Sequence, residues 1–169
     1  MPGLRTLHHD LYFERMRSSI GDKARILDFL RPGSVLDVGA GDGSLVRAMR
    51  EGGWDAVGVD ASPEAVARSG GLVRLGRAEG LVEEFGDRWF DNVVFCSCLH
   101  EVWSYSDAPD RDQALLGVLR EAAALLAPGG RLVIRDGVGP DMKGEAWTEA
   151  SGKQRWTPDT WRLVLNDPE

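Results

Sequence analysis

The chain has 169 residues, of which 43% are hydrophobic and 28% charged, and this length and composition predict a single globular domain. Its formal net charge of −7 and its scattered Lys and Arg residues argue against a nucleic-acid partner, because neutralising phosphates requires clustered positive charge. No apolar run approaches the roughly 18 residues of a membrane span, and the first residues lack the apolar segment of a signal peptide, so we expect a cytoplasmic protein without a membrane partner.

The first 33 residues predict an N-terminal helical cap. Apolar residues recur at helical spacing over residues 9–30, with a break expected at residues 19–22. Strand and helix patterns then alternate. The expected strands cover residues 34–38, 56–59, 72–75, 92–98 and 131–134. The expected helices cover residues 44–51, a segment after Ser62 with that residue as N-cap, 81–89 and 112–126, the last one ended by a turn at residues 127–130.

This alternation predicts an α/β fold with a doubly wound, mostly parallel sheet covered by helices on both faces, over a core of residues 34–137. Residues 138–169 are rich in Gly, Pro, Asp and Glu. They predict an irregular C-terminal tail with one short helix near its end.

The loop after the first expected strand has glycine at every second position, namely Gly39, Gly41 and Gly43. Glycine adopts backbone conformations that are closed to other residues and lets a ligand lie directly on the main chain. The second expected strand ends at an acidic residue, Asp60. A carboxylate there suits a diol, because its two acceptor oxygens match two adjacent hydroxyl donors.

The Asp-x-Gly-x-Gly-x-Gly spacing of residues 37–43 resembles the first motif of class I S-adenosylmethionine (SAM)-dependent methyltransferases. It differs from the Gly-x-Gly-x-x-Gly of nicotinamide enzymes. The resemblance continues through Gly-Arg-Ala-Glu at residues 76–79, the apolar pattern of residues 90–102 and the Pro-Gly-Gly of residues 128–130. It implies a Rossmann-like fold, SAM as cofactor, S-adenosylhomocysteine as product and methyl transfer by in-line displacement.

The resemblance also implies cofactor contacts. Gly39, Ala40 and Gly41 would lie under the methionine part and ribose of SAM. Asp37 would hold this loop and the methionine amino group, and Asp60 would accept both ribose hydroxyls.

Four further cofactor contacts come from the later motifs. Ala61 would lie beside the adenine, and the amide of Ala78 would meet the adenine ring edge. Glu79 would accept from the adenine amine, because Arg77 replaces the acidic residue that the family often has there. The backbone near Cys96 would accept from the methionine ammonium.

His100 follows the fourth expected strand, where a doubly wound sheet presents its carboxyl ends to a ligand. Its ordinary pKa near neutrality suits a general base for a hydroxyl nucleophile, and a packed or substrate-orienting histidine is the alternative. Trp103 and Tyr105 fall in an expected loop, where they either border the substrate or the sulfonium or simply pack. The acceptor-side candidates are Ser97, Trp103, Tyr105 and Asp136.

Cys96, Cys98 and His100 alternate, and on one continuous strand they would share a face. Three ligands on one extended strand do not easily surround an ion, so we expect buried thiols and no metal site.

The acidic charge and the lack of an Asn/Asp-Pro-Pro-Tyr signature after the fourth strand favour a small-molecule methyl acceptor, of which the sequence specifies neither identity nor attacking atom. Three alternatives remain. They are another SAM-dependent reaction on this fold, a non-catalytic SAM-binding or partner module, and an NAD-type oxidoreductase, which the glycine spacing disfavours.

A complete class I methyltransferase usually adds two further strands, and residues 138–169 predict no convincing pair. The chain is therefore a minimal domain, a truncated one, or a protein whose sheet edge is covered by a second copy or another protein.

Overall fold

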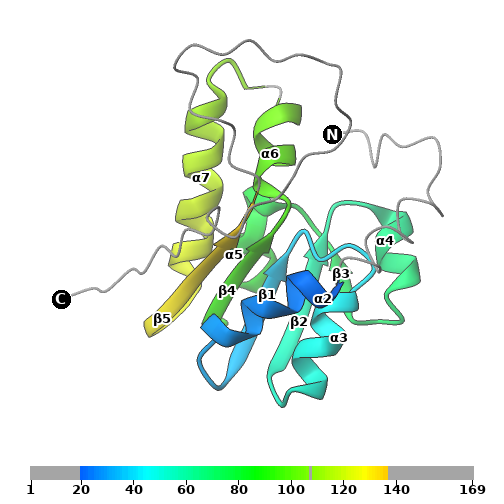
Figure 1. Cartoon of the computed structure of the whole chain (residues 1–169). Coiled ribbons are helices and arrows are strands. Elements are labelled where there is room, and N and C mark those ends of the chain that lie inside the picture. Colours follow the sequence, from blue (N-terminus) through cyan, green and yellow to red (C-terminus); the bar gives the residue numbers. More distant parts are fainter. Residues whose placement is uncertain (1–19, 107, 137–169) are drawn as a thin grey trace, which may run out of the picture.

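The computed structural model describes residues 20–106 and 108–136, which form a single parallel sheet with helices on both faces (Figure 1). The five strands lie in the order β3-β2-β1-β4-β5. Their bounds are β1 Ser34–Val38, β2 Asp55–Asp60, β3 Val73–Leu75, β4 Phe90–Cys96 and β5 Leu126–Arg135. The α-helices are α2 Ile20–Lys23, α3 Ser44–Glu51, α4 Pro63–Arg68, α5 Leu81–Phe85, α6 Leu99–Tyr105 and α7 Arg111–Ala124, with short 3-10 helices at η1 Ala24–Phe29 and η2 Ala78–Gly80. The predicted doubly wound α/β fold is confirmed.

Alternate residues of the central strands supply two hydrophobic cores. Leu36 and Phe95 pack with α5, α6 and α7 on one face of the sheet. Val35 and Val94 pack with η1 and α3 on the other. Strands buried on both faces need the near-continuous apolar sequence that β1 and β4 have. No helix within residues 20–106 and 108–136 has the length and apolar character to cross a bilayer.

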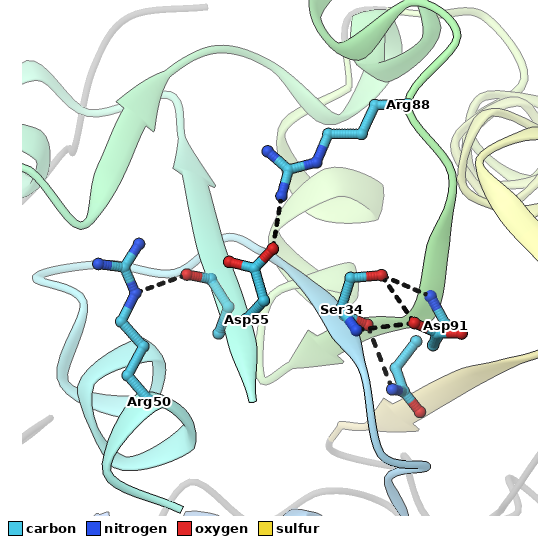
Figure 2. A network of polar contacts seen from close by, with 7 residues as sticks. Ser34, Arg50, Asp55, Arg88 and Asp91 are labelled. Carbon is cyan, nitrogen blue, oxygen red and sulfur yellow. Dashed lines mark hydrogen bonds and ion pairs between the residues drawn. The ribbon is translucent and has the colours of Figure 1, made fainter. Parts of the chain in front are cut away.

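A polar latch fixes the register of β1 and β4 at their amino ends (Figure 2). The main-chain N–H of Ser34 donates to Oδ2 of Asp91 at 2.8 Å, and its hydroxyl donates to the same oxygen at 2.9 Å. The N–H of Asp91 donates back to the Ser34 hydroxyl at 3.0 Å. These bonds lower the pKa of the Asp91 carboxyl. The latch holds β1, and with it the glycine loop at its other end, in line with β4.

Two helical predictions agree with the structure. The helix at residues 44–51 ends before Gly52. The helix after Ser62 begins at Pro63, with the Ser62 hydroxyl accepting from the Ala65 amide at 3.2 Å. Serine at the N-cap and proline at the first helical position account for this start.

The segment around Ala24 corrects the predicted break at residues 19–22. Within the described residues the chain is helical from Ile20 to Phe29 and changes from α to 3-10 geometry after Lys23. The rest of the predicted N-terminal cap, residues 1–19, and the predicted tail, residues 138–169, lie outside the described residues.

The ends of the last two strands also differ from the prediction. β4 ends at Cys96 rather than at residue 98, and residues 99–105 form helix α6 rather than a loop. β5 begins at Leu126, so the Pro-Gly-Gly turn lies inside the strand. The register explains this, because Phe90 pairs with Leu126 while Asn92 pairs with Arg131, and the residues between bulge out.

Candidate active site

All strands are parallel, so the segments that follow them meet at one edge of the sheet. The glycine loop after β1, Asp60 at the end of β2, Ser97 after β4 and Asp136 after β5 all lie at this carboxyl edge. The parallel sheet therefore places these candidate residues at one edge, and the side-chain contacts decide which of them act together.

The glycine loop has a backbone that side-chain-bearing residues rarely adopt. Gly39, Gly41 and Gly43 have φ angles of 73°, 57° and 77°. The main-chain N–H groups of Gly39 and Ala40 both donate to the carbonyl of Val59, at 2.9 and 3.1 Å, which ties the loop to β2. A Cβ on Gly39 would lie 2.5 Å from Cβ of Cys98. Glycine is required here both for conformation and for space.

Asp60 closes the loop from the side of β2. Its Oδ2 accepts from the amide of Gly41 at 2.8 Å, and its Oδ1 accepts from the amide of Ser62 at 2.8 Å. Burial raises the pKa of Asp60, and the two amide bonds oppose this. Each carboxylate oxygen has a second lone pair, so both retain capacity for a diol.

A pocket below the loop brings together two opposite charges, Asp37 from β1 and Lys23 from α2. It has an empty volume of about 320 Å³, including space open to solvent. Both residues are buried, with Asp37 1% exposed and Lys23 9% exposed. The pocket is lined by Ile20, Lys23, Asp37, Gly39, Ala40, Asp42, Ser44, Leu45 and Cys96.

Asp37 is the unusual group in this pocket. Burial raises its pKa to about 7, with the charge of Lys23 lowering it and the charge of Asp60 raising it. Among the residues that the structure describes, Oδ1 of Asp37 has no hydrogen-bond partner. A buried carboxylate oxygen without a donor is costly unless a ligand supplies one.

Lys23 was not predicted as a site residue. The available signal was its position three residues after Ile20 and three before Ile26, which puts a lysine on the apolar side of a helical pattern. The charged end of a lysine is almost never fully buried without a partner.

Cys96 and Cys98 lie on opposite faces of the sheet, which corrects the prediction of a shared strand face with His100. Cys96 packs in the core beside η1 and α3, and Cys98 in the core beside α6. Burial raises the pKa of the Cys96 thiol to about 11, so it stays protonated at neutral pH. Nowhere in residues 20–106 and 108–136 do three His, Cys, Asp or Glu side chains gather in a way that could hold a metal ion.

Ser97 turns the chain away from β4 with a φ of 61°, a conformation uncommon for a residue other than glycine. Its main-chain N–H donates to the carbonyl of Arg135 at 2.6 Å. The guanidinium of Arg135 donates to the Ser97 hydroxyl at 2.8 Å. Two bonds from one residue of β5 hold this strained position, and backbone strain of this kind clusters at functional sites.

His100 and Asp136 form a close pair across the carboxyl edge. Nδ1 of His100 lies 2.6 Å from Oδ1 of Asp136, and the main-chain N–H of His100 donates to Oδ2 at 3.1 Å. The pKa of His100 is raised, first by the hydrogen bond to Asp136 and then by the charges of Asp136 and Glu101, with burial opposing. Glu101, which sequence reasoning missed, is half-buried, and this desolvation raises the pKa of its carboxyl group.

Other predicted site residues lie elsewhere at the edge. Glu79 pairs with Arg77 at 3.1 Å, and both are exposed. Nε1 of Trp103 donates to Oδ1 of Asp112 at 2.9 Å, and the guanidinium of Arg111 lies over its ring. Within the described part of the chain, the pocket lining does not include Ala61, Ala78, Glu79, Ser97, Trp103, Tyr105 or Asp136.

A family model described as a methyltransferase domain matches residues 11–164. The chain belongs to this methyltransferase family. The fold and the glycine loop agree with the class I SAM-dependent methyltransferases that the sequence resembles, and that prediction is confirmed.

The chain is also similar in sequence to a curated relative and in fold to a solved structure. An uncharacterized methyltransferase of Mycobacterium bovis is 29% identical over 163 residues, covering 92% of this chain and 56% of the relative. The chain thus spans about half the length of this curated relative. A TehB-like SAM-dependent methyltransferase from Corynebacterium glutamicum shares the fold with a TM-score of 0.57 and 22% identity, covering 75% of this chain and 71% of that one.

A third similarity is to a solved complex from Haloferax volcanii, between the Trm112 methyltransferase activator and a methyltransferase. It has a TM-score of 0.56 and 21% identity, and it covers 78% of this chain and 61% of that one. At this identity the similarity concerns the fold.

Proposed function

We propose that this methyltransferase binds SAM at the glycine loop and transfers its methyl group to a small-molecule acceptor. The observation that carries the proposal is the pocket in which Asp37 and Lys23 lie buried below the loop. An α-amino acid carries one ammonium and one carboxylate. The orphaned Oδ1 of Asp37 fits the ammonium, and the amine of Lys23 fits the carboxylate.

The other contacts follow from the loop outwards. The bare backbone of Gly39 and Gly41 gives the sulfur nucleoside a surface without side chains. Asp60 keeps two lone pairs for the ribose hydroxyls while its amide bonds hold the loop. Ala61, Ala78 and Glu79 are proposed for the adenine side, with Glu79 leaving its ion pair with Arg77.

When bound, SAM supplies a methyl group already activated by its sulfonium. This chain then has to align the acceptor with that methyl and exclude water, and alignment of this kind is worth roughly 7–11 kcal/mol. We propose that His100 removes a proton from the acceptor where one must be lost. The net charge of −7 supports a small-molecule acceptor over a nucleic acid.

A partner protein is the second candidate role, carried by a different observation. Within the described residues, β5 lies at the end of the sheet and pairs only with β4. The Haloferax volcanii methyltransferase is described in a complex with an activator. A second copy of this chain or another protein is proposed to cover the β5 edge.

Calorimetric titration with SAM, S-adenosylhomocysteine and NAD tests the cofactor. We expect micromolar binding of both sulfur nucleosides, no binding of NAD, and loss of binding in Asp60→Ala. Glu51→Gln, which changes an exposed carboxylate at the end of α3, is the matched control and should bind as the unmodified protein does. Binding of NAD alone would contradict the proposal.

A further inference from the structure

We propose that Asp136 is a positioning residue that makes Nε2 of His100 the general base, and that the acceptor therefore reacts through a hydroxyl group. This inference rests on the proposed methyl transfer, and it replaces the sequence-based view of Asp136 as a substrate contact. It assigns the attacking atom, which neither the family nor the fold specifies.

The carboxylate of Asp136 clamps His100, contacting it at both its ring and its main chain. Oδ1 of Asp136 meets the ring at Nδ1, 2.6 Å away, while Oδ2 accepts from the main chain of the same histidine at 3.1 Å. Asp136 follows β5 and His100 lies in the first turn of α6, so the two residues are 36 positions apart in the sequence. Both the backbone and the ring of His100 are thereby fixed by a single carboxylate.

The side chain of His100 is more exposed than that of Asp136, as a general base requires. Asp136 is 12% exposed and His100 is 50% exposed. The carboxylate is therefore largely shielded from solvent, while half of the imidazole side chain remains exposed. A structural ion pair has no need of this asymmetry, whereas a base must reach its substrate.

The clamp also decides which nitrogen is basic. A carboxylate accepts hydrogen bonds and does not donate them, so the proton of the neutral imidazole stays on Nδ1 beside Oδ1. Nε2 then carries the free lone pair. Among residues 20–106 and 108–136, the charged groups that act on the ring are Asp136 after β5 and Glu101 on α6, and both negative charges favour the imidazolium that proton transfer creates.

The proposed step couples methyl transfer from SAM to proton transfer from the acceptor hydroxyl. The acceptor oxygen bonds to the methyl carbon while the carbon–sulfur bond breaks and its electron pair stays on sulfur, leaving S-adenosylhomocysteine. The hydroxyl proton moves to Nε2 of His100, and the imidazolium later releases it to solvent. A thiol that is already ionised at neutral pH, or a free amine, attacks without this proton transfer, so a fixed base is of use chiefly to a hydroxyl.

The first test measures the tautomer and the pKa of His100 and needs no methyl acceptor. Nitrogen NMR of the imidazoles, with the His100 signals assigned by their loss in His100→Gln, reports tautomer and pKa. We expect a proton on Nδ1 and a raised pKa in the unmodified protein, and both lost in Asp136→Ala and reduced in Asp136→Asn. Asp87→Asn, an exposed carboxylate before β4, is the control and should change neither. An unchanged His100 signal in both Asp136 variants would overturn the positioning role.

The second test uses labelled SAM with matched phenols and aryl thiols of the same shape. We expect phenol methylation that falls roughly 100-fold or more in Asp136→Asn and His100→Gln at neutral pH and recovers at high pH, where phenols ionise unaided. Thiol methylation should change far less. Equal loss of phenol and thiol methylation in the two variants would overturn the hydroxyl assignment. So would an unmodified protein that binds SAM and methylates only thiols, or that methylates no phenol.

Calorimetry separates this inference from the function on which it rests. SAM should bind Asp136→Asn as it binds the unmodified protein, because Asp136 does not line the pocket described here. If the unmodified protein fails to bind SAM, the proposed function fails, while the NMR experiment still decides the role of Asp136.

Discussion

The carboxylate of Asp60 accepts a hydrogen bond from the main-chain amide of Gly41 at 2.8 Å, which joins the end of β2 to the loop that follows β1. The residue proposed for the ribose diol is thus also part of the scaffold that shapes the loop. A defect in Asp60 therefore has two separable effects, one on the ligand and one on the fold.

We predict that Asp60→Asn and Asp60→Ala separate these effects. Either change removes a charged acceptor of backbone hydrogen bonds, which is worth about 1.5–3 kcal/mol per bond. The amide oxygen of Asn still accepts from one N–H, so Asp60→Asn should lose less stability than Asp60→Ala, while both lose at least about 10-fold in SAM affinity. Urea unfolding and calorimetry measure the two quantities. Unchanged SAM affinity in a folded Asp60→Ala protein would contradict the diol role.

Gly39→Ala tests whether the loop needs both conformation and space. Gly39 has a φ of 73°, and an added Cβ would lie 2.5 Å from Cβ of Cys98. Gly53 has a φ of 94° with open space around it, so Gly53→Ala carries the backbone strain alone and serves as the control. We expect Gly53→Ala to cost about 1 kcal/mol and Gly39→Ala to cost roughly 1–3 kcal/mol more. Equal losses in urea unfolding would show that the contact with Cys98 is relieved at no cost.

The raised pKa of Asp37 predicts a pH dependence of stability in the ligand-free protein. Its pKa is about 7 when folded and near 3.9 in an unfolded chain. Between these values the folded state binds more protons, so its stability falls as the pH rises from about 4 to about 7. The full change is up to about 4 kcal/mol.

Asp37→Asn should remove this dependence and make the ligand-free protein more stable near pH 8 while weakening SAM binding. Asp28→Asn, at an exposed position of η1, is the control and should keep the slope. Urea unfolding near pH 5 and near pH 8 measures the difference. A slope that persists in Asp37→Asn would assign the dependence to another group.

The Ser34–Asp91 latch predicts the opposite sign at acid pH. The hydrogen bonds from Ser34 lower the pKa of Asp91, so their contribution is present above the unfolded pKa and is lost as the pH falls through the folded one. Asp91→Ala should cost about 1 kcal/mol near neutrality, since solvent screens part of the pair, and should flatten the acid limb of unfolding. Circular dichroism during acid titration measures the acid limb of unfolding. A double-mutant cycle with Ser34→Ala measures the interaction between the two residues. Additive effects of the two changes would mean that the latch contributes nothing.

The fold was predictable from sequence because local patterns specify it. The apolar runs of β1 and β4, the glycine loop and the Ser62-Pro63 helix start each carry their own physical signal. Helix α6 was missed since residues such as His100, Trp103 and Tyr105 have weak helix propensity, and Ser97 ends β4 earlier than its apolar pattern suggests.

The candidate site was only partly predictable. The loop and Asp60 follow from spacing, but pairings between distant elements do not. Asp136 meets His100 across 36 residues, and nothing local in either segment indicates it. Lys23 is buried where α2 packs beside α3, and it lines the same pocket as Asp37, so its role depends on tertiary packing.

Comparison of two ligands in one variant tests whether the pocket of Asp37 and Lys23 holds the amino-acid end of SAM. Methylthioadenosine has the nucleoside and sulfur of SAM without the amino-acid part. Calorimetry should show that Lys23→Gln weakens SAM binding by roughly 10-fold or more, because a lost charge-assisted bond is worth about 1.5–3 kcal/mol. The affinity for methylthioadenosine should stay unchanged. If Lys23→Gln weakened the binding of both ligands equally, or changed the binding of neither, the pocket would not hold the amino-acid end of SAM.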